Sequence, residues 1–254
     1  MLIDAHTHIF APRQRDTRAA ICDADPTFAE MYGNPAAAMA DATELLAALD
    51  DAGIDRAVAA GFAFAGAEDI ATQNQYLLDA ATASSGRIIP LATVNPARPG
   101  WRDAAEQAIW RGVAGFGELR PGNQGWHALA AASHEPADLA AAHGVVLLWH
   151  VSEPVGHRYP GKAGGIGPVE LCELATAHRE TKMIAAHLGG GLPFFVQMPE
   201  IRSALANMWF DTAAASLLYD DRSVARLAGL AGSERVLFGS DYPLLSPRRQ
   251  LQRI

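Results

Sequence analysis

Ile3-Asp4-Ala5-His6-Thr7-His8, near the start of the chain, is the stretch that decides the fold. A short apolar strand signal, Leu2–Ala5, runs directly into a His-x-His pair. An open doubly wound sheet usually has a glycine-rich phosphate loop at this point, and the chain has none there. The later glycine-rich stretches, 164–167 and 189–191, lack the dinucleotide-binding spacing. The first segment therefore favours a closed barrel over an open sheet.

Seven further strand signals follow, separated by stretches of helical character at a spacing of about 25–35 residues that suits βα units. They are Ile54–Gly61, Arg87–Val94, Val113–Leu119, Gly144–His150, Lys182–His187, Asn207–Thr212 and Arg235–Asp241. One helix, Asp41–Gly53, shows a capping box at Asp41 and Glu44 and a glycine stop. Eight units without a linker predict an α/β protein, a (β/α)8 TIM barrel, in a single domain over residues 1–254.

The composition and net charge of the chain limit the classes of molecule that it is expected to bind. Half of the 254 residues are hydrophobic, which provides a large core, and the formal net charge is −8. An acidic balance argues against nucleic acid, so we expect a small-molecule substrate. No apolar run is long enough for a bilayer and no secretory leader is visible, so we expect a cytoplasmic protein without a membrane partner. Cys22 and Cys172 are expected to be free thiols.

Two connections are unusually long for a compact domain. Residues 9–40 separate the first strand from the first helix, and residues 151–168 follow the fifth strand. Long loops of this kind are usually functional. Both leave the C-terminal ends of strands, where barrel enzymes place their active sites. We therefore expect two lids over that face.

Ionisable residues end several of the apolar strands. His6 and His8 are two apart on a strand, so their side chains share a face with Asp4. A lone His-x-His pair is a weak motif, and any single polar strand end is more simply a satisfied core or rim residue. Buried parallel strands have no structural need for such residues, however, and four more strands end in the same way. They end in Glu118, His150, His187 and Asp241.

Barrel closure would bring Asp241 beside His6 and His8, because the eighth strand pairs with the first. Converging imidazoles and a carboxylate suit a borderline cation such as Zn²⁺. Asp241 would then bind the metal, take a proton from its water, or do both.

The strand-end residues resemble the amidohydrolase superfamily, and within it the amidohydrolase-related branch known as amidohydrolase 2. The resemblance covers nearly the whole chain and rests on Ile3–His8, His150, His187–Gly191, Phe210–Ala213 and Leu237–Pro243. It implies that His6, His8, His150 and Asp241 bind a divalent metal, for which we expect Zn²⁺. His187 is implied either to act in catalysis beside one ion or to bind a second ion. Glu118 stands where many two-metal members have a carboxylated lysine, so it either bridges two ions or serves beside one; we expect one ion.

The implied activity is hydrolysis of a small amide, lactone or ester-like bond by metal-activated water, with Asp241 as general base and His187 assisting. The alternative is a lyase, a non-oxidative decarboxylase or hydratase, because that branch uses the same ligands for both. A metal site without catalysis and a nuclease are weaker readings. Arg120, Arg158 and Lys162 are candidates to hold a substrate carboxylate, although each is equally a solvated loop charge. The resemblance also implies a final helix that covers strand eight. Residues 246–254 are a short segment for such a helix. We therefore expect that neighbouring structure or a second subunit of a homo-oligomer covers strand eight, or that the chain is a shortened form.

Overall fold

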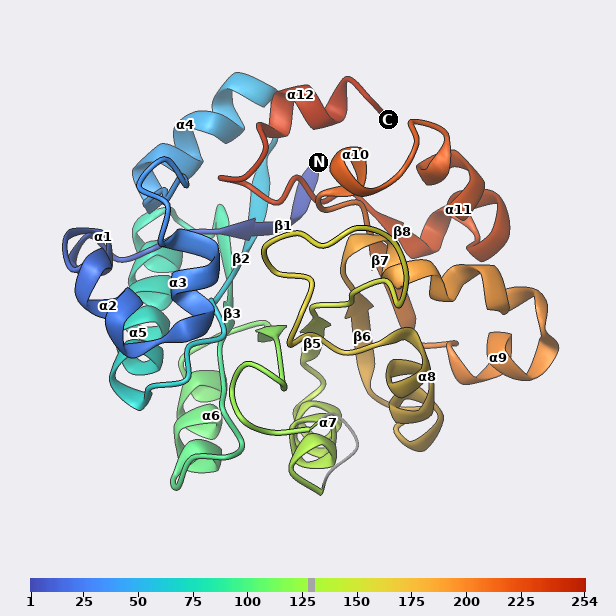
Figure 1. The fold of residues 1–254 in the computed structure, drawn as a ribbon, viewed down its shortest axis with the longest axis horizontal. Helices are drawn as coiled ribbons and strands as arrows, with labels where there is room; N and C mark the ends of the chain where they lie inside the picture. Colours follow the sequence, from blue (N-terminus) through green and yellow to red (C-terminus); the bar gives the residue numbers. More distant parts are fainter. Residues whose placement is uncertain (128–130) are drawn as a thin grey trace.

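Eight parallel strands follow one another around the sheet in chain order, as a computed structural model that describes residues 1–127 and 131–254 shows. The strands are β1 (Ile3–His8), β2 (Arg56–Ala60), β3 (Ile88–Ala92), β4 (Gly115–Leu119), β5 (Val146–Trp149), β6 (Lys182–Ala185), β7 (Met208–Asp211) and β8 (Val236–Leu237). Helices on the outside connect them (Figure 1). The predicted (β/α)8 barrel is confirmed.

The outer layer and the connections contain short and long helices. They are α1 (Pro12–Asp16), α2 (Arg18–Ala24), α3 (Pro26–Tyr32), α4 (Ala42–Ala52), α5 (Ala67–Ala83), α6 (Trp101–Trp110), α7 (Ala131–His143), α8 (Pro168–Ala177), η1 (His187–Gln197), α9 (Pro199–Ala204), α10 (Ala215–Leu218), α11 (Ser223–Ala231), η2 (Ser233–Arg235) and α12 (Pro247–Leu251). Helix α4 has the predicted capping box, and Gly53 ends it in the left-handed conformation. Among the described residues, no helix is long and apolar enough to cross a membrane.

Side chains of β5 show how the strands sort their residues. Leu148 lies inside the barrel with apolar residues from β2, β3 and β6. Leu147 and Trp149 belong instead to the cluster between the strands and the outer helices. Because side chains alternate along a strand, His150 follows Trp149 on the inner side. The apolar strand therefore directs its terminal histidine into the barrel.

The barrel closes beyond the end of β8 rather than along it. The predicted strand Arg235–Asp241 is regular only at Val236–Leu237. Past it, the nitrogen of Ala5 donates to the carbonyl of Phe238 (2.7 Å), and the nitrogen of Asp241 donates to the carbonyl of His6 (2.9 Å). The end of the chain thus lies beside β1, as closure requires.

The connection 9–40 is not the open loop expected from the sequence. It folds into α1, α2 and α3, which lie at one side of the barrel end (blue in Figure 1). The Asp25 carboxylate caps α3 by accepting the N–H groups of Thr27 and Phe28, and Pro26 occupies the first helical position. An aromatic cluster anchors this helical insertion to the strands; it contains Phe10, Phe28, Tyr32, Phe62 and Phe64.

The second long connection, 151–168, contains no helix before Pro168, where α8 begins. It leaves β5 and arches across the middle of the barrel end (yellow in Figure 1). Its two ends lie side by side, joined by an isolated β-bridge between Val151 and Ile166. Both cysteines are free. Helix α12 packs against α4, where Arg248 and Asp51 form an ion pair of 2.7 Å.

Candidate metal centre

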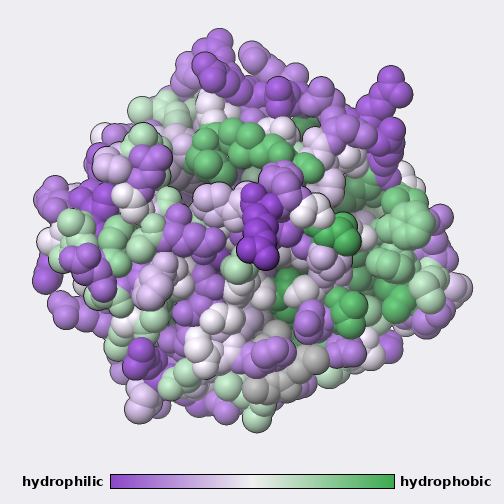
Figure 2. All heavy atoms as spheres, viewed as in Figure 1, coloured by the Kyte–Doolittle hydropathy of each residue, from purple (hydrophilic) through white to green (hydrophobic). Residues whose placement is uncertain are grey.

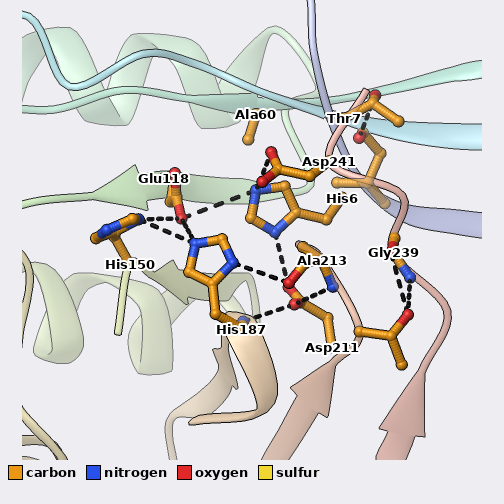
Figure 3. Close-up of polar contacts among 12 residues, drawn as sticks. His6, Thr7, Ala60, Glu118, His150, His187, Asp211, Ala213, Gly239 and Asp241 are labelled. Carbon is orange, nitrogen blue, oxygen red and sulfur yellow. Dashed lines mark hydrogen bonds and ion pairs between the residues drawn. The ribbon is translucent and has the colours of Figure 1, made fainter. Parts of the chain in front are cut away.

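The six polar residues predicted at the strand ends come together at one end of the barrel. All are buried, and they come from β1, β4, the ends of β5 and β6, and the turn after β8. Their ligand atoms form two groups that can each hold a metal ion: His6, His8 and Asp241, and Glu118, His150 and His187. Figure 3 shows Glu118 between rings of both groups.

The first group lies where the two ends of the barrel meet. The Nε2 atoms of His6 and His8 are 3.1 Å apart, and Oδ1 of Asp241 lies 3.9 Å and 3.6 Å from them. Asp241 reaches this position with a left-handed backbone, at a φ of 62°. The expected neighbourhood of Asp241 and the His pair is therefore present.

The second group lies across the barrel. Oε1 of Glu118 is 2.8 Å from Nδ1 of His150 and 3.3 Å from Nε2 of His187, and the two ring nitrogens are 3.1 Å apart. Glu118 also faces the first group, with Oε1 3.8 Å from Nε2 of His6 and Oε2 3.7 Å from Nε2 of His8. His150, which the resemblance assigned to the ion of His6 and His8, thus lies with Glu118 and His187.

The outer nitrogen of every ring is held by a fixed acceptor. Nδ1 of His6 contacts the Asp211 carboxylate at 2.7 Å, and Nδ1 of His8 contacts the carbonyl of Ala60 at 3.1 Å. In the other group, Nδ1 of His187 lies 3.0 Å from the carbonyl of Ala213, and Nε2 of His150 lies 2.7 Å from the carbonyl of Gly161. Since these oxygens only accept, the outer nitrogens carry the hydrogens.

The inner nitrogens therefore present lone pairs to one another and to two carboxylates. Lone pairs at about 3 Å repel unless a cation lies between them, so each group requires a proton or a metal ion. The donor set of imidazoles and carboxylates fits a divalent transition metal.

The pKa shifts of the site residues also indicate that a cation is favoured between them. Although burial opposes it, the carboxylates of Asp211, Glu118 and Asp241 raise the pKa of His6 to about 10. Burial is likewise outweighed at His187, whose pKa rises to about 9 beside Glu118. Burial would raise the pKa of Glu118, but the surrounding histidines hold it well below its usual range. The field in the site thus favours positive charge.

Asp211 is the residue that the sequence did not reveal as part of the site. In the sequence it lies near the end of the seventh strand signal, where a rim hydrogen bond is the simpler interpretation. It is fully buried, and its Oδ1 accepts the backbone N–H groups of His187 (2.9 Å) and Ala213 (3.0 Å) while Oδ2 accepts from His6. One carboxylate therefore orients a histidine of the first group and the backbone of the second.

The chain leaves β6 through a left-handed turn that begins at His187. His187 and Leu188 have φ values of 58° and 55°, and three glycines, 189–191, continue the turn. Non-glycine residues rarely adopt this conformation, and those that do are often at functional sites. Gly190 also packs closely, since a Cβ there would lie 3.0 Å from the carbonyl oxygen of Ser152. The glycine run thus shapes the turn that directs His187 into the barrel.

The three predicted substrate-binding cations have different places. Arg120 is buried, and its Nη2 donates to the carbonyls of Gly161 (3.0 Å) and Ala163 (2.7 Å). Lys162 bonds within its own loop, to the carbonyl of Val155 and, at 3.9 Å, the carboxylate of Glu153. Arg158 is exposed. Of the three, the structure brings only Arg120 towards the candidate site.

Two further residues frame the site. Asp4 shares the face of the His pair, but its Oδ1 accepts the N–H of Ser240 at 2.9 Å and belongs to neither ligand group. Burial, with the nearby carboxylates of Asp241 and Glu118, raises the pKa of Tyr32, which keeps its phenol protonated. Figure 2 shows that side chains cover the middle of this face.

Comparison with known proteins places this architecture in a family. The family model described as amidohydrolase matches residues 3–254. The chain belongs to the amidohydrolase family. The resemblance read from the strand ends is confirmed, and family membership supports the expectation of an enzyme. A search of curated proteins gave no match.

Solved structures with this fold cover almost the whole chain at low sequence identity. The 5-carboxyvanillate decarboxylase of Sphingomonas paucimobilis has a TM-score of 0.80 at 15% identity, over 99% of this chain and 91% of that one. The corresponding enzyme of Novosphingobium aromaticivorans, complexed with manganese and 4-hydroxy-3-methoxy-5-nitrobenzoic acid, gives 0.77 at 16%, over 100% and 89%. A 2,6-dihydroxybenzoate decarboxylase from Rhizobium gives 0.68 at 13%, over 100% and 92%. At these identities the likeness concerns the fold.

Proposed function

We propose that this protein is a metal-dependent, non-oxidative decarboxylase of a hydroxylated aromatic carboxylic acid. The observation that carries the proposal is the convergence of four histidines, each with its outer nitrogen within hydrogen-bonding distance of a fixed acceptor, on two buried carboxylates. The decarboxylases of similar fold favour this reaction over the hydrolysis that we expected first.

The ion that the first group is suited to bind would supply a Lewis acid to hold and polarise substrate oxygens. We expected Zn²⁺ from the donor set, whereas a decarboxylase of similar fold is complexed with manganese; we propose a divalent ion of this kind. We keep the expectation of one ion and assign it to His6, His8 and Asp241. In this form His187 is not a ligand, and Oε1 of Glu118, 3.3 Å from its Nε2, is the acceptor that would hold a proton there.

The other groups then have defined tasks. The bond between the ring carbon and the carboxyl carbon breaks, its electron pair stays on the ring carbon, and a proton replaces the departing CO₂. Asp241 and His187 are the groups placed to move that proton. The Nε–H of Arg120 is buried without a partner among the described residues, so it is free for a substrate carboxylate. Tyr32 lies close enough to Asp241 and Glu118 for their charges to act on its hydroxyl group, and it belongs to the aromatic cluster, which we propose as the apolar side of the substrate site.

A substrate panel separates the proposed reaction from hydrolysis. Protein loaded with Mn²⁺ or Zn²⁺ is incubated with hydroxybenzoic acids, amides and lactones. We expect CO₂ from at least one acid and, in D₂O, one deuterium at the vacated ring carbon. Turnover of an amide or lactone without CO₂ release from any acid would overturn the proposal and support the hydrolase.

Metal content tests the assignment of the ion. His6→Ala with His8→Ala should remove the bound ion and all turnover, whereas His150→Ala with His187→Ala should keep the ion and lose turnover. Elemental analysis of the purified proteins measures the count per chain. Two ions in the wild type, with one retained in each double variant, would show that both groups bind metal and that His187 is a ligand.

A further inference from the structure

The main chain of Gly161, at the middle of the connection 151–168, is held from three sides. Its carbonyl oxygen accepts from Nη2 of Arg120 (3.0 Å) and from Nε2 of His150 (2.7 Å). Its N–H donates to Oε1 of Glu30 (3.1 Å), on α3 of the helical insertion. The two connections that we expected to act as lids therefore meet at one residue, directly over a histidine of the site.

Residue 161 has to be a glycine for this contact. Its φ is 93°, a left-handed value that side chains rarely allow, and a Cβ there would lie 3.1 Å from Sδ of Met31. The buried backbone at this point is thus fitted between α3 and Arg120.

The Gly161 carbonyl has a chemical consequence for His150. A neutral imidazole carries one hydrogen, and the acceptor on one nitrogen decides which tautomer is present. The Glu118 carboxylate, 2.8 Å from Nδ1, competes for that hydrogen, so the Gly161 carbonyl, 2.7 Å from Nε2, is the group that favours a hydrogen on Nε2 and leaves Nδ1 as a lone-pair donor towards Glu118 and His187. Lifting the connection would remove this acceptor and release the choice of tautomer.

Arg120 is built to keep that carbonyl in place. It follows β4 two residues after Glu118, it is buried, and its Nη2 also donates to Ala163, so one planar group holds both ends of the short segment 161–163. The Nη2 group of this buried guanidinium is committed to two loop carbonyls and holds the loop, which leaves the Nε–H as the donor without a partner among the described residues.

We propose that Arg120 is a positioning residue: by holding the Gly161 carbonyl against His150, it fixes which ring nitrogen His150 turns towards Glu118 and His187. This half of the site is then set only when the connection 151–168 lies down on it. The inference deepens the proposed function, on which its importance for turnover rests, but the contact itself is measurable without substrate.

The test compares Arg120→Met with the conservative Arg120→Lys and with Arg158→Met, an exposed arginine of the same connection. ¹⁵N NMR of histidine-labelled, metal-free protein reports the tautomer of His150, whose signals are assigned by their loss in His150→Gln. Amide hydrogen exchange of 161–163 reports the connection. The wild type and Arg158→Met should show the Nε2–H tautomer alone and protected amides.

Arg120→Met should populate both tautomers and speed exchange of these amides by about tenfold or more, which is local opening. Arg120→Lys should restore most of both properties, because an ammonium at this position has enough donors for the two carbonyls. A folded Arg120→Met protein with the wild-type tautomer would overturn the proposal. If Arg120→Met does not fold, the exposed substitution Glu30→Ala is the second test, because Glu30 holds the N–H of Gly161. We expect a smaller change of the His150 tautomer in the same direction. An unchanged His150 signal in Glu30→Ala would also overturn the proposal.

The outcomes separate from those of the proposed function. A protein that decarboxylates no acid but changes its His150 tautomer in Arg120→Met retains the positioning role and loses the reaction. An active decarboxylase in which Arg120→Met leaves the tautomer unchanged retains the reaction and loses the positioning role.

Discussion

Asp211 links the two ligand groups through a single carboxylate, and this makes it the sharpest residue-scale test of the site. Oδ2 accepts from the His6 ring, and Oδ1 accepts from the His187 backbone. In Asp211→Asn one of these oxygens becomes an NH₂ group, which cannot accept. We expect the affinity for the bound ion to fall about 10- to 100-fold, the usual effect of losing a partner that orients a metal-binding histidine.

Competition with a chelating dye measures the dissociation constant of the Asp211→Asn protein, and thermal unfolding checks its fold. Asp220→Asn is the matched control, because Asp220 is exposed and pairs with Arg226 on the surface. A dissociation constant equal to that of the wild type would mean that Asp211 orients neither group in a way that matters for the ion.

The site residues that the sequence predicted are those whose signal is local. His150 and His187 end apolar runs, so an ionisable side chain stands out there even in a single sequence. Asp211 also ends a strand, but its role in the site comes from its contact with His6. The two residues are 205 positions apart, so no local sequence pattern shows this contact. The grouping of His150 with Glu118 depends on which nitrogen each ring turns inward, and that is decided by backbone carbonyls.

At the scale of elements, Glu153 ties the connection 151–168 to the segment after β7. Its Oε2 accepts from the Tyr159 hydroxyl (2.7 Å), within the connection, and its Oε1 accepts from the Tyr219 hydroxyl (2.6 Å), which follows α10. Tyr219→Phe removes the contact between elements, whereas Tyr159→Phe removes one inside the loop. We expect Tyr219→Phe to speed amide exchange across 151–168 by up to about tenfold, through local opening, and Tyr159→Phe to have the smaller effect.

The pH dependence of this tie has a definite sign. Burial raises the pKa of Glu153, but the two hydroxyl groups outweigh it and lower the pKa below the usual 4.5. The stabilisation is therefore fully present above pH 4.5 and is lost as the pH falls through the lowered value. Exchange protection in 151–168 that declined already between pH 8 and pH 6 would contradict this role of Glu153.

The elements that the sequence left undescribed are the short ones. We predicted α4 because a capping box, an apolar stripe and Gly53 agree over 11 residues. Helices α1, α2 and α3 have 5 to 7 residues each, too short for a clear periodic pattern. Asp25 before Pro26 was the available signal for α3, since this pair starts many helices. Their stability comes from the aromatic cluster, which tertiary structure assembles.

For the whole molecule, the barrel was predictable because each parallel strand is buried on both faces and so reads as an apolar run. Strand order and closure then follow from right-handed βα connections. The sequence did not predict, however, which residues of the last segment pair with β1 to close the barrel. Strand β8 is regular over two residues, and the chain beyond it is held to β1 by individual bonds, including Ser240 to the Asp4 carboxylate.

Gly239 tests whether this closure sets the stability of the molecule and the geometry of the site together. A Cβ at Gly239 would lie 2.9 Å from Cβ of His6, and because each Cβ is fixed to its Cα, neither can move unless the backbone that carries it shifts. We expect Gly239→Ala to cost about 1–3 kcal/mol by overpacking, which lowers Tm by about 2–4 °C per kcal/mol in a chain of this size. The same shift moves the His6 ring, so metal affinity should fall in parallel.

The matched control is Gly229→Ala, because Gly229 lies in α11 with nothing within 4 Å of an added Cβ. There the change should stabilise by up to about 0.5–1 kcal/mol, since alanine favours the helix more than glycine does. Calorimetry and dye competition on both variants give the two quantities. Gly239 lies in the segment after β8 and packs against His6 of β1. If Gly239→Ala lost stability without any change in metal affinity, barrel closure and the assembly of the first ligand group would be independent features of the fold.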